Sequence, residues 1–247
     1  MCTYLYELSD RLSIIINESK SVTINTSEFE IGARGWFYTQ WSGRFYPEDL
    51  PEEWKFVYYS NQFRTVLVPT ELFCQSELAD IEDWVENCND EFRFYIEVLP
   101  TTNWEQIKPK IDCLNQQLAG IVIRSDSGSL AAPELVEALL VQALEVVPTY
   151  IDAVIAGILD AAEISHKNNE LGCVCDYEDL QSDWIKPFSR AVVLISTANG
   201  QEPKQLRKMF NSFLSNNSLV VYSLFFASSV PQIKDMETMQ TIYTLGA

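Results

Sequence analysis

Short runs of apolar, often β-branched residues alternate along the chain with longer segments in which apolar residues recur every three or four positions. The first pattern is typical of strands and the second of amphipathic helices. Strands are expected at residues 29–31, 65–68, 92–98, 120–123, 150–155, 171–175, 191–195 and 219–226. Helices are expected at residues 51–63, 77–88, 104–118, 133–147, 158–168, 203–214 and 231–245. In the first of these helices, Trp54, Val57 and Tyr58 mark the expected apolar stripe.

About eight strand–helix units predict an α/β fold, a TIM-like (β/α)8 barrel. Residues 191–195 are apolar without interruption, as in strands that a parallel sheet buries on both faces. Periodicity does not show closure, so a doubly wound open sheet is the alternative. No long linker interrupts the pattern, and we expect one barrel domain over residues 28–247. Residues 1–27 are expected to form an N-terminal extension.

Charge narrows the classes of function. The 247 residues carry a formal net charge of −18, so the chain is acidic and repels polyanions. We therefore expect no nucleic-acid partner and no docking on an anionic membrane. The longest apolar run, residues 153–159, is shorter than the roughly 18 residues of a membrane span, and no basic leader precedes the first apolar stretch. These features predict a soluble, cytoplasmic protein.

Few residues offer familiar catalytic or metal chemistry. Six cysteines are scattered through the chain, and the close pair Cys173 and Cys175 has no second Cys or His cluster nearby. Glycine-rich phosphate loops and a Ser-His-Asp arrangement are also missing. The one histidine, His166, falls in an expected helix, away from strand ends. The sequence therefore predicts no metal and no cofactor, and it identifies no catalytic residue.

One segment has a distinctive pattern. Residues 31–38 are IGARGWFY, residues 41–47 are WSGRFYP, and the helix that follows contains WKFVYYSNQF. This segment resembles the opening of the YecE-like family, the domain of unknown function numbered seventy-two. That family has a strand of the form IGxSGW, a loop YxxWxGxFYP and a helix LxxYaxxF. The family is a TIM-like barrel without an assigned reaction, so the resemblance implies the fold and no substrate.

Beyond this segment, the chain departs from the family at polar positions. The acid and the amide of the family's second strand correspond to Leu67 and Pro69, its third-strand lysine to Glu97, and a glutamine after the fourth strand to Arg124. The Arg, His and amide groups of later strands have apolar or small replacements. Because barrel catalysis uses polar groups at the carboxyl ends of strands, these losses predict a catalytically degenerate barrel that acts as a binding or interaction protein.

Two sets of residues are candidates for ligand binding. The first belongs to the loop after the first strand, where guanidinium groups and rings could meet a ligand over the barrel mouth: Arg34, Trp36, Tyr38, Trp41, Arg44 and Tyr46. The alternative is that these aromatics form a hydrophobic lid packed on the first helix. The second set is Glu71, Glu97 and Arg124, expected at the mouth.

These residues define the alternative function, an enzyme or small-anion-binding barrel with a rewired site. Glu71 and Glu97 could also form a carboxylate pair that shares a proton or holds a divalent cation. Arg124 with Asp126 could equally form a structural pair. The expected partner is a small anionic ligand or another protein.

Overall fold

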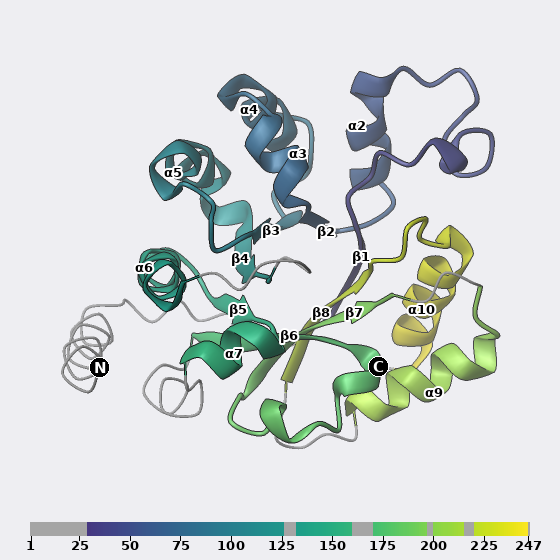
Figure 1. Ribbon diagram of the computed structural model, residues 1–247. Coiled ribbons are helices and arrows are strands. Elements are labelled where there is room, and N and C mark those ends of the chain that lie inside the picture. Colours follow the sequence, from purple (N-terminus) through teal and green to yellow (C-terminus); the bar gives the residue numbers. More distant parts are fainter. Residues whose placement is uncertain (1–28, 126–131, 160–169, 197–199, 215–219, 247) are drawn as a thin grey trace.

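The computed structural model describes residues 29–125, 132–159, 170–196, 200–214 and 220–246. In these residues eight parallel strands close into a barrel in sequence order, and β1 pairs with β8 (Figure 1). The strands are β1 Glu30–Arg34, β2 Thr65–Val68, β3 Arg93–Val98, β4 Leu118–Ile123, β5 Thr149–Ile151, β6 Leu171–Asp176, β7 Arg190–Ile195 and β8 Val220–Phe226. The predicted TIM-like barrel is confirmed, and the open sheet is excluded. The expected extension, residues 1–27, lies outside the described residues.

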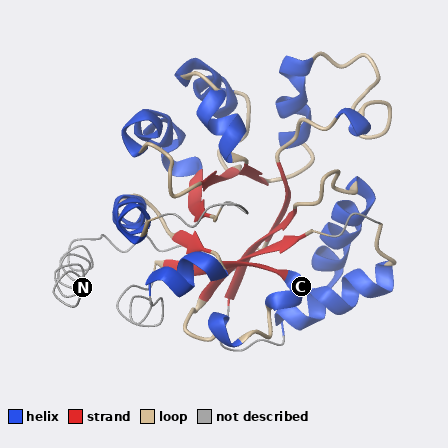
Figure 2. Cartoon of the chain, viewed as in Figure 1, coloured by secondary structure: helices blue, strands red, loops and turns tan. Residues whose placement is uncertain are grey.

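Helices surround the strands, as Figure 2 shows. They are α2 Lys55–Ser60, α3 Thr70–Gln75, α4 Leu78–Glu86, α5 Trp104–Leu114, α6 Pro133–Leu144, α7 Ala153–Leu159, α9 Pro203–Leu214 and α10 Ile233–Gly246. The sequence pattern did not predict α3. This short helix is tied to the barrel through Thr70, whose hydroxyl donates to the backbone oxygen of Glu97 at 2.9 Å.

The barrel interior is filled with side chains rather than open. Its core members are Leu67, Tyr95, Val122, Tyr150, Val174, Val192, Leu194 and Phe225. Gly120 makes room for two of these rings, because a Cβ there would lie 2.8 Å from Tyr150 and 2.9 Å from Tyr95. Interior and exterior positions alternate along each strand, so residues two places beyond this core point toward the barrel mouth.

The face that α2 buries differs from the prediction. A 3-10 turn at Glu52–Trp54 precedes α2, and Trp54 is 58% exposed instead of contributing to a buried stripe. The buried face carries Phe56 and Tyr59. The Tyr59 hydroxyl accepts a hydrogen bond from the Ala33 amide at 2.8 Å and donates to the Thr65 oxygen at 2.9 Å, which joins β1 to β2. The change of helix type shifts the helical phase, which explains the wrong face.

The fifth strand is shorter than expected. The predicted strand at residues 150–155 ends at Ile151, and α7 begins at Ala153. Asp152 causes the change, because its carboxylate accepts the Ile155 amide at 2.9 Å, as an N-cap residue does. The expected helix at residues 158–168 falls mostly outside the described residues.

Candidate functional site

The carboxyl ends of the strands bring three predicted residues together. Arg34 ends β1, Glu97 lies near the end of β3 and Arg124 directly follows β4. Glu97 and Arg124 lie two positions beyond the interior residues Tyr95 and Val122, so their side chains point into the mouth, where TIM-like barrels place their functional groups. The Arg34 side chain joins them there through its hydrogen bonds to Glu97.

Glu97 is the centre of this cluster. Its side chain is only 5% exposed, and its two oxygens accept hydrogen bonds from Arg34 Nε at 2.8 Å and Arg34 Nη2 at 2.6 Å. Arg124 Nη1 lies 3.4 Å from Glu97 Oε2. The paired geometry with Arg34 is the bidentate fork that guanidinium groups favour. Hydrogen bonding to Glu97 raises the pKa of Arg34. We call Arg34, Glu97 and Arg124 the mouth ion cluster.

Glu71 stands at the edge of this cluster. It lies in α3, its side chain is 69% exposed, and one oxygen is 3.6 Å from Arg34 Nη2. Arg34 therefore lies between two carboxylates. The Glu71 and Glu97 carboxylates thus share one cation, the Arg34 guanidinium.

Two acids of the mouth were missed in the sequence. Asp152 and Asp176 lie two positions beyond the interior residues Tyr150 and Val174, so alternation along each strand was the available signal. Asp152 accepts both the amide and the hydroxyl of Ser125 at 2.7 Å. Asp176 accepts the Ser196 hydroxyl. Both carboxylates thus hold neighbouring segments in place.

The aromatic residues of the first loop are packed into the core. Trp36, Trp41 and Tyr46 are each at most 3% exposed. The Tyr46 hydroxyl donates to the Trp36 oxygen at 2.7 Å, and the Trp41 indole N–H donates to the Pro231 oxygen at 2.9 Å. This geometry matches the hydrophobic-lid alternative, with the loop packed beside α2. Their rings have no free face for a ligand in this arrangement.

The other two members of that loop set, Tyr38 and Arg44, differ in their surroundings. The Tyr38 hydroxyl donates to the Arg34 oxygen, and burial raises the pKa of Tyr38 to about 12. Arg44 is exposed, and no ion pair with it occurs among the described residues. The loop therefore contributes Arg34 to the mouth cluster and leaves Arg44 outside it.

Several sequence predictions concern absent features. Within the described ranges, no group of three or more His, Cys, Asp or Glu side chains could hold a metal ion. None of the helices in the described part of the chain is both long enough and apolar enough to cross a membrane. His166 and Asp126 lie outside the described residues.

Comparison with known proteins connects this geometry to a family. Residues 30–112 match the family described as protein of unknown function DUF72, which is the YecE-like family. A DUF72 family protein from Thermotoga maritima has 15% identity and a TM-score of 0.61, covering 89% of this chain and 99% of its own. A DUF72 family protein from Enterococcus faecalis has 11% identity and a TM-score of 0.62, covering 88% of this chain and 96% of its own.

The two kinds of match cover different lengths of chain. The sequence match is confined to the first strands and helices, whereas the structural similarity extends over most of the barrel. None of the curated proteins compared with the chain matches it. The family resemblance is therefore confirmed: residues 30–112 have the DUF72 sequence pattern, and the chain has the fold of solved DUF72 proteins.

Proposed function

We propose that this chain is a catalytically degenerate barrel that acts as a binding or interaction protein. The observation that carries the proposal is the pairing of Glu97, the mouth carboxylate best shielded from water. Both of its oxygens are engaged by guanidinium groups of the same chain. A general acid or base must reach a proton on a substrate, and Glu97 is directed at Arg34 and Arg124 instead.

The neighbouring acids support the same proposal. Asp152 caps α7 and holds Ser125, and Asp176 accepts from Ser196. These contacts use the carboxylates to fix backbone segments around the mouth. The polar groups present are thus engaged with one another, in the way of a structural network.

A second candidate is binding of a small anion at the mouth, and one observation favours it. Arg124 makes a single 3.4 Å contact with Glu97, and its side chain is 33% exposed. Its remaining N–H donors could bind a carboxylate or phosphate together with Arg34. Glu71 and Glu97 contact these guanidinium groups, and their two negative charges oppose the binding of an anion.

A thermal-shift screen with small phosphates, carboxylates and sugars distinguishes the candidates. A ligand at 100 times its dissociation constant stabilises the folded state by about 2.7 kcal/mol, which is measurable. The proposal predicts that no small ligand stabilises the folded chain through contacts with the mouth ion cluster. A ligand that stabilises the parent and Arg64→Ala but not Arg124→Ala would refute it and establish the second candidate. Arg64 is the matched control because its side chain is 62% exposed and pairs with Glu91 away from the mouth.

A further inference from the structure

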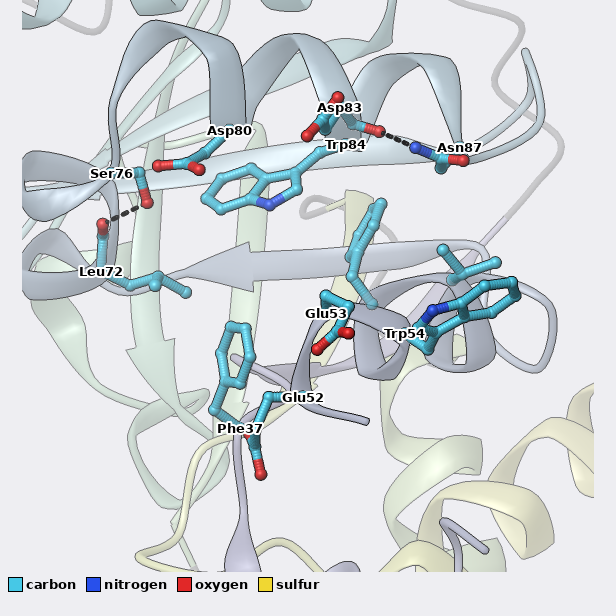
Figure 3. Close-up of a pocket in the computed structure, with 12 residues that line it drawn as sticks. Phe37, Glu52, Glu53, Trp54, Leu72, Ser76, Asp80, Asp83, Trp84 and Asn87 are labelled. Carbon is cyan, nitrogen blue, oxygen red and sulfur yellow. Dashed lines mark hydrogen bonds between the residues drawn. The ribbon is translucent and has the colours of Figure 1, made fainter. Parts of the chain in front are cut away.

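A groove lies outside the barrel, between the segment that precedes α2 and the α3–α4 segment. Its volume is about 530 Å³. It is lined by Phe37, Glu52, Glu53, Trp54, Phe56, Val57, Leu72, Ser76, Asp80, Asp83, Trp84 and Asn87. Figure 3 shows Glu52 and Glu53 on one side of the opening and Asp80 and Asp83 on the other, with the Glu52 carboxylate directed away from α4. We call it the α2–α4 groove.

Two large rings of the groove are exposed to solvent. Trp54 is 58% exposed and Phe37 is 46% exposed, whereas Trp84 of the same groove is only 8% exposed. Trp84 packs edge-on against the buried Trp36, with ring centroids 4.9 Å apart. Trp36 also lies 4.9 Å from the Phe56 ring. Phe37 packs on this buried base, with its ring centroid 5.1 Å from that of Trp36, so holding the Phe37 ring in place costs little further side-chain entropy on binding.

The charge of the groove has one sign. Its lining, as far as the structure describes it, includes no Lys or Arg. Lys55 pairs with Glu52 at 2.5 Å, but the Lys55 side chain is only 4% exposed. No ion pair with Glu53 or Asp83 occurs within the described ranges, and both residues are exposed. An anionic ligand would be repelled here, while a cation would meet carboxylates on two walls and the faces of aromatic rings.

We propose that the α2–α4 groove binds a basic, partly apolar peptide segment of a partner protein. A lysine or arginine of the peptide stacks on Trp54 and pairs with Glu53 or Asp83, and an adjacent apolar side chain packs against Phe37 and Leu72. The combination of exposed rings with unpaired acids selects this occupant, because each feature alone would suit a different ligand. The inference rests on the proposed interaction function and names the chemistry of the partner.

Fluorescence anisotropy with three labelled peptides tests the inference. The probe alternates lysine and leucine, and the two comparison peptides alternate lysine with serine and glutamate with leucine. The probe is expected to bind the full chain, more weakly as salt rises, and the comparison peptides at least about tenfold more weakly. Equal binding of the lysine–serine peptide would overturn the inference, because the groove's apolar side chains would then contribute nothing. Failure of the probe to bind would also overturn it.

Matched variants locate the binding. Asp83→Lys reverses a groove charge, and its control is Glu82→Lys, the neighbouring exposed acid of α4 that does not line the groove. Trp54→Ala removes an exposed ring, and its control is Leu135→Ala, an apolar residue of α6 that is 51% exposed. The two groove variants are expected to weaken probe binding about tenfold or more, and the controls less than about twofold. Equal losses in Asp83→Lys and Glu82→Lys would indicate non-specific attraction and overturn the inference.

Two further measurements separate this inference from other possibilities. If sedimentation shows a dimer of the parent that Trp54→Ala dissociates, the groove binds a second copy of the chain and the peptide inference is wrong. Arg124→Ala is expected to bind the probe as the parent does, because the mouth ion cluster is not part of the groove. A mouth-dependent small ligand would therefore refute the proposed function without changing probe binding, and loss of probe binding would leave the thermal-shift result intact.

Discussion

Glu97→Gln is the most direct perturbation of the mouth ion cluster. The substitution keeps the shape of the side chain, removes its charge and points an amide N–H₂ toward guanidinium donors. Hydrogen bonds to charged groups contribute about 1.5–3 kcal/mol, and breaking a fully buried ion pair costs about 3–5 kcal/mol. The Glu97 side chain is 5% exposed, but those of Arg34 and Arg124 are 28% and 33% exposed, so water partly compensates the freed cations. The expected loss of unfolding free energy is therefore about 3 kcal/mol.

Urea unfolding followed by tryptophan fluorescence and circular dichroism measures this loss. For a domain of this size, about 3 kcal/mol corresponds to a decrease of about 6–12 °C in Tm. Asp112→Asn is the control, because the Lys108–Asp112 ion pair is on the exposed surface of α5. That variant is expected to change stability by less than about 0.5 kcal/mol. If Glu97→Gln unfolds at the same urea concentration as the parent, the contacts of Glu97 do not stabilise the barrel, and the structural role assigned to them is wrong.

Three further predictions concern the residues that build the mouth and its surroundings. Tyr59→Phe leaves the buried Ala33 amide without its acceptor and is expected to cost about 1–3 kcal/mol in urea unfolding; an unchanged midpoint would contradict the hydroxyl bridge. Gly120→Val places methyl groups against the Tyr95 and Tyr150 rings, and the unfolding free energy is expected to decrease by at least about 1–3 kcal/mol. A variant as stable as the parent would show that the barrel interior has room for a larger side chain. Because burial raises the pKa of Tyr38 to about 12, above its usual value, its contribution to stability is complete below about pH 10 and is lost as pH rises toward 12. The unfolding free energy of Tyr38→Phe should therefore decrease less steeply than that of the parent between pH 10 and 12. If the tyrosinate absorbance of the two proteins titrates identically, the raised pKa does not belong to Tyr38.

The barrel could be predicted from the sequence because strands buried on both faces leave short apolar runs, and helices that bury one face leave an apolar period of three or four residues. The contacts at the mouth could not. Arg34 and Glu97 are 63 residues apart, and only barrel closure with a defined register brings their side chains together. The exposure of Trp54 was also out of reach, since it depends on the 3-10 turn that shifts the phase of the following helix. Asp152 was missed because it was counted within a longer strand.

The family pattern and the proposed chemistry occupy the same part of the chain for different reasons. Residues 30–112 match the family, and within them Trp36, Trp41, Tyr46 and Tyr59 are buried. The side chains of Trp41, Tyr46 and Tyr59 also donate hydrogen bonds to backbone oxygens. These matching residues close the first loop over α2 and join β1 to β2, so the match reports how the barrel is built. In the proposed binding function, specificity must then come from residues that the packing does not require. Exposed Trp54 and the unpaired acids of the α2–α4 groove meet that condition, which is why the partner is sought there rather than in the mouth.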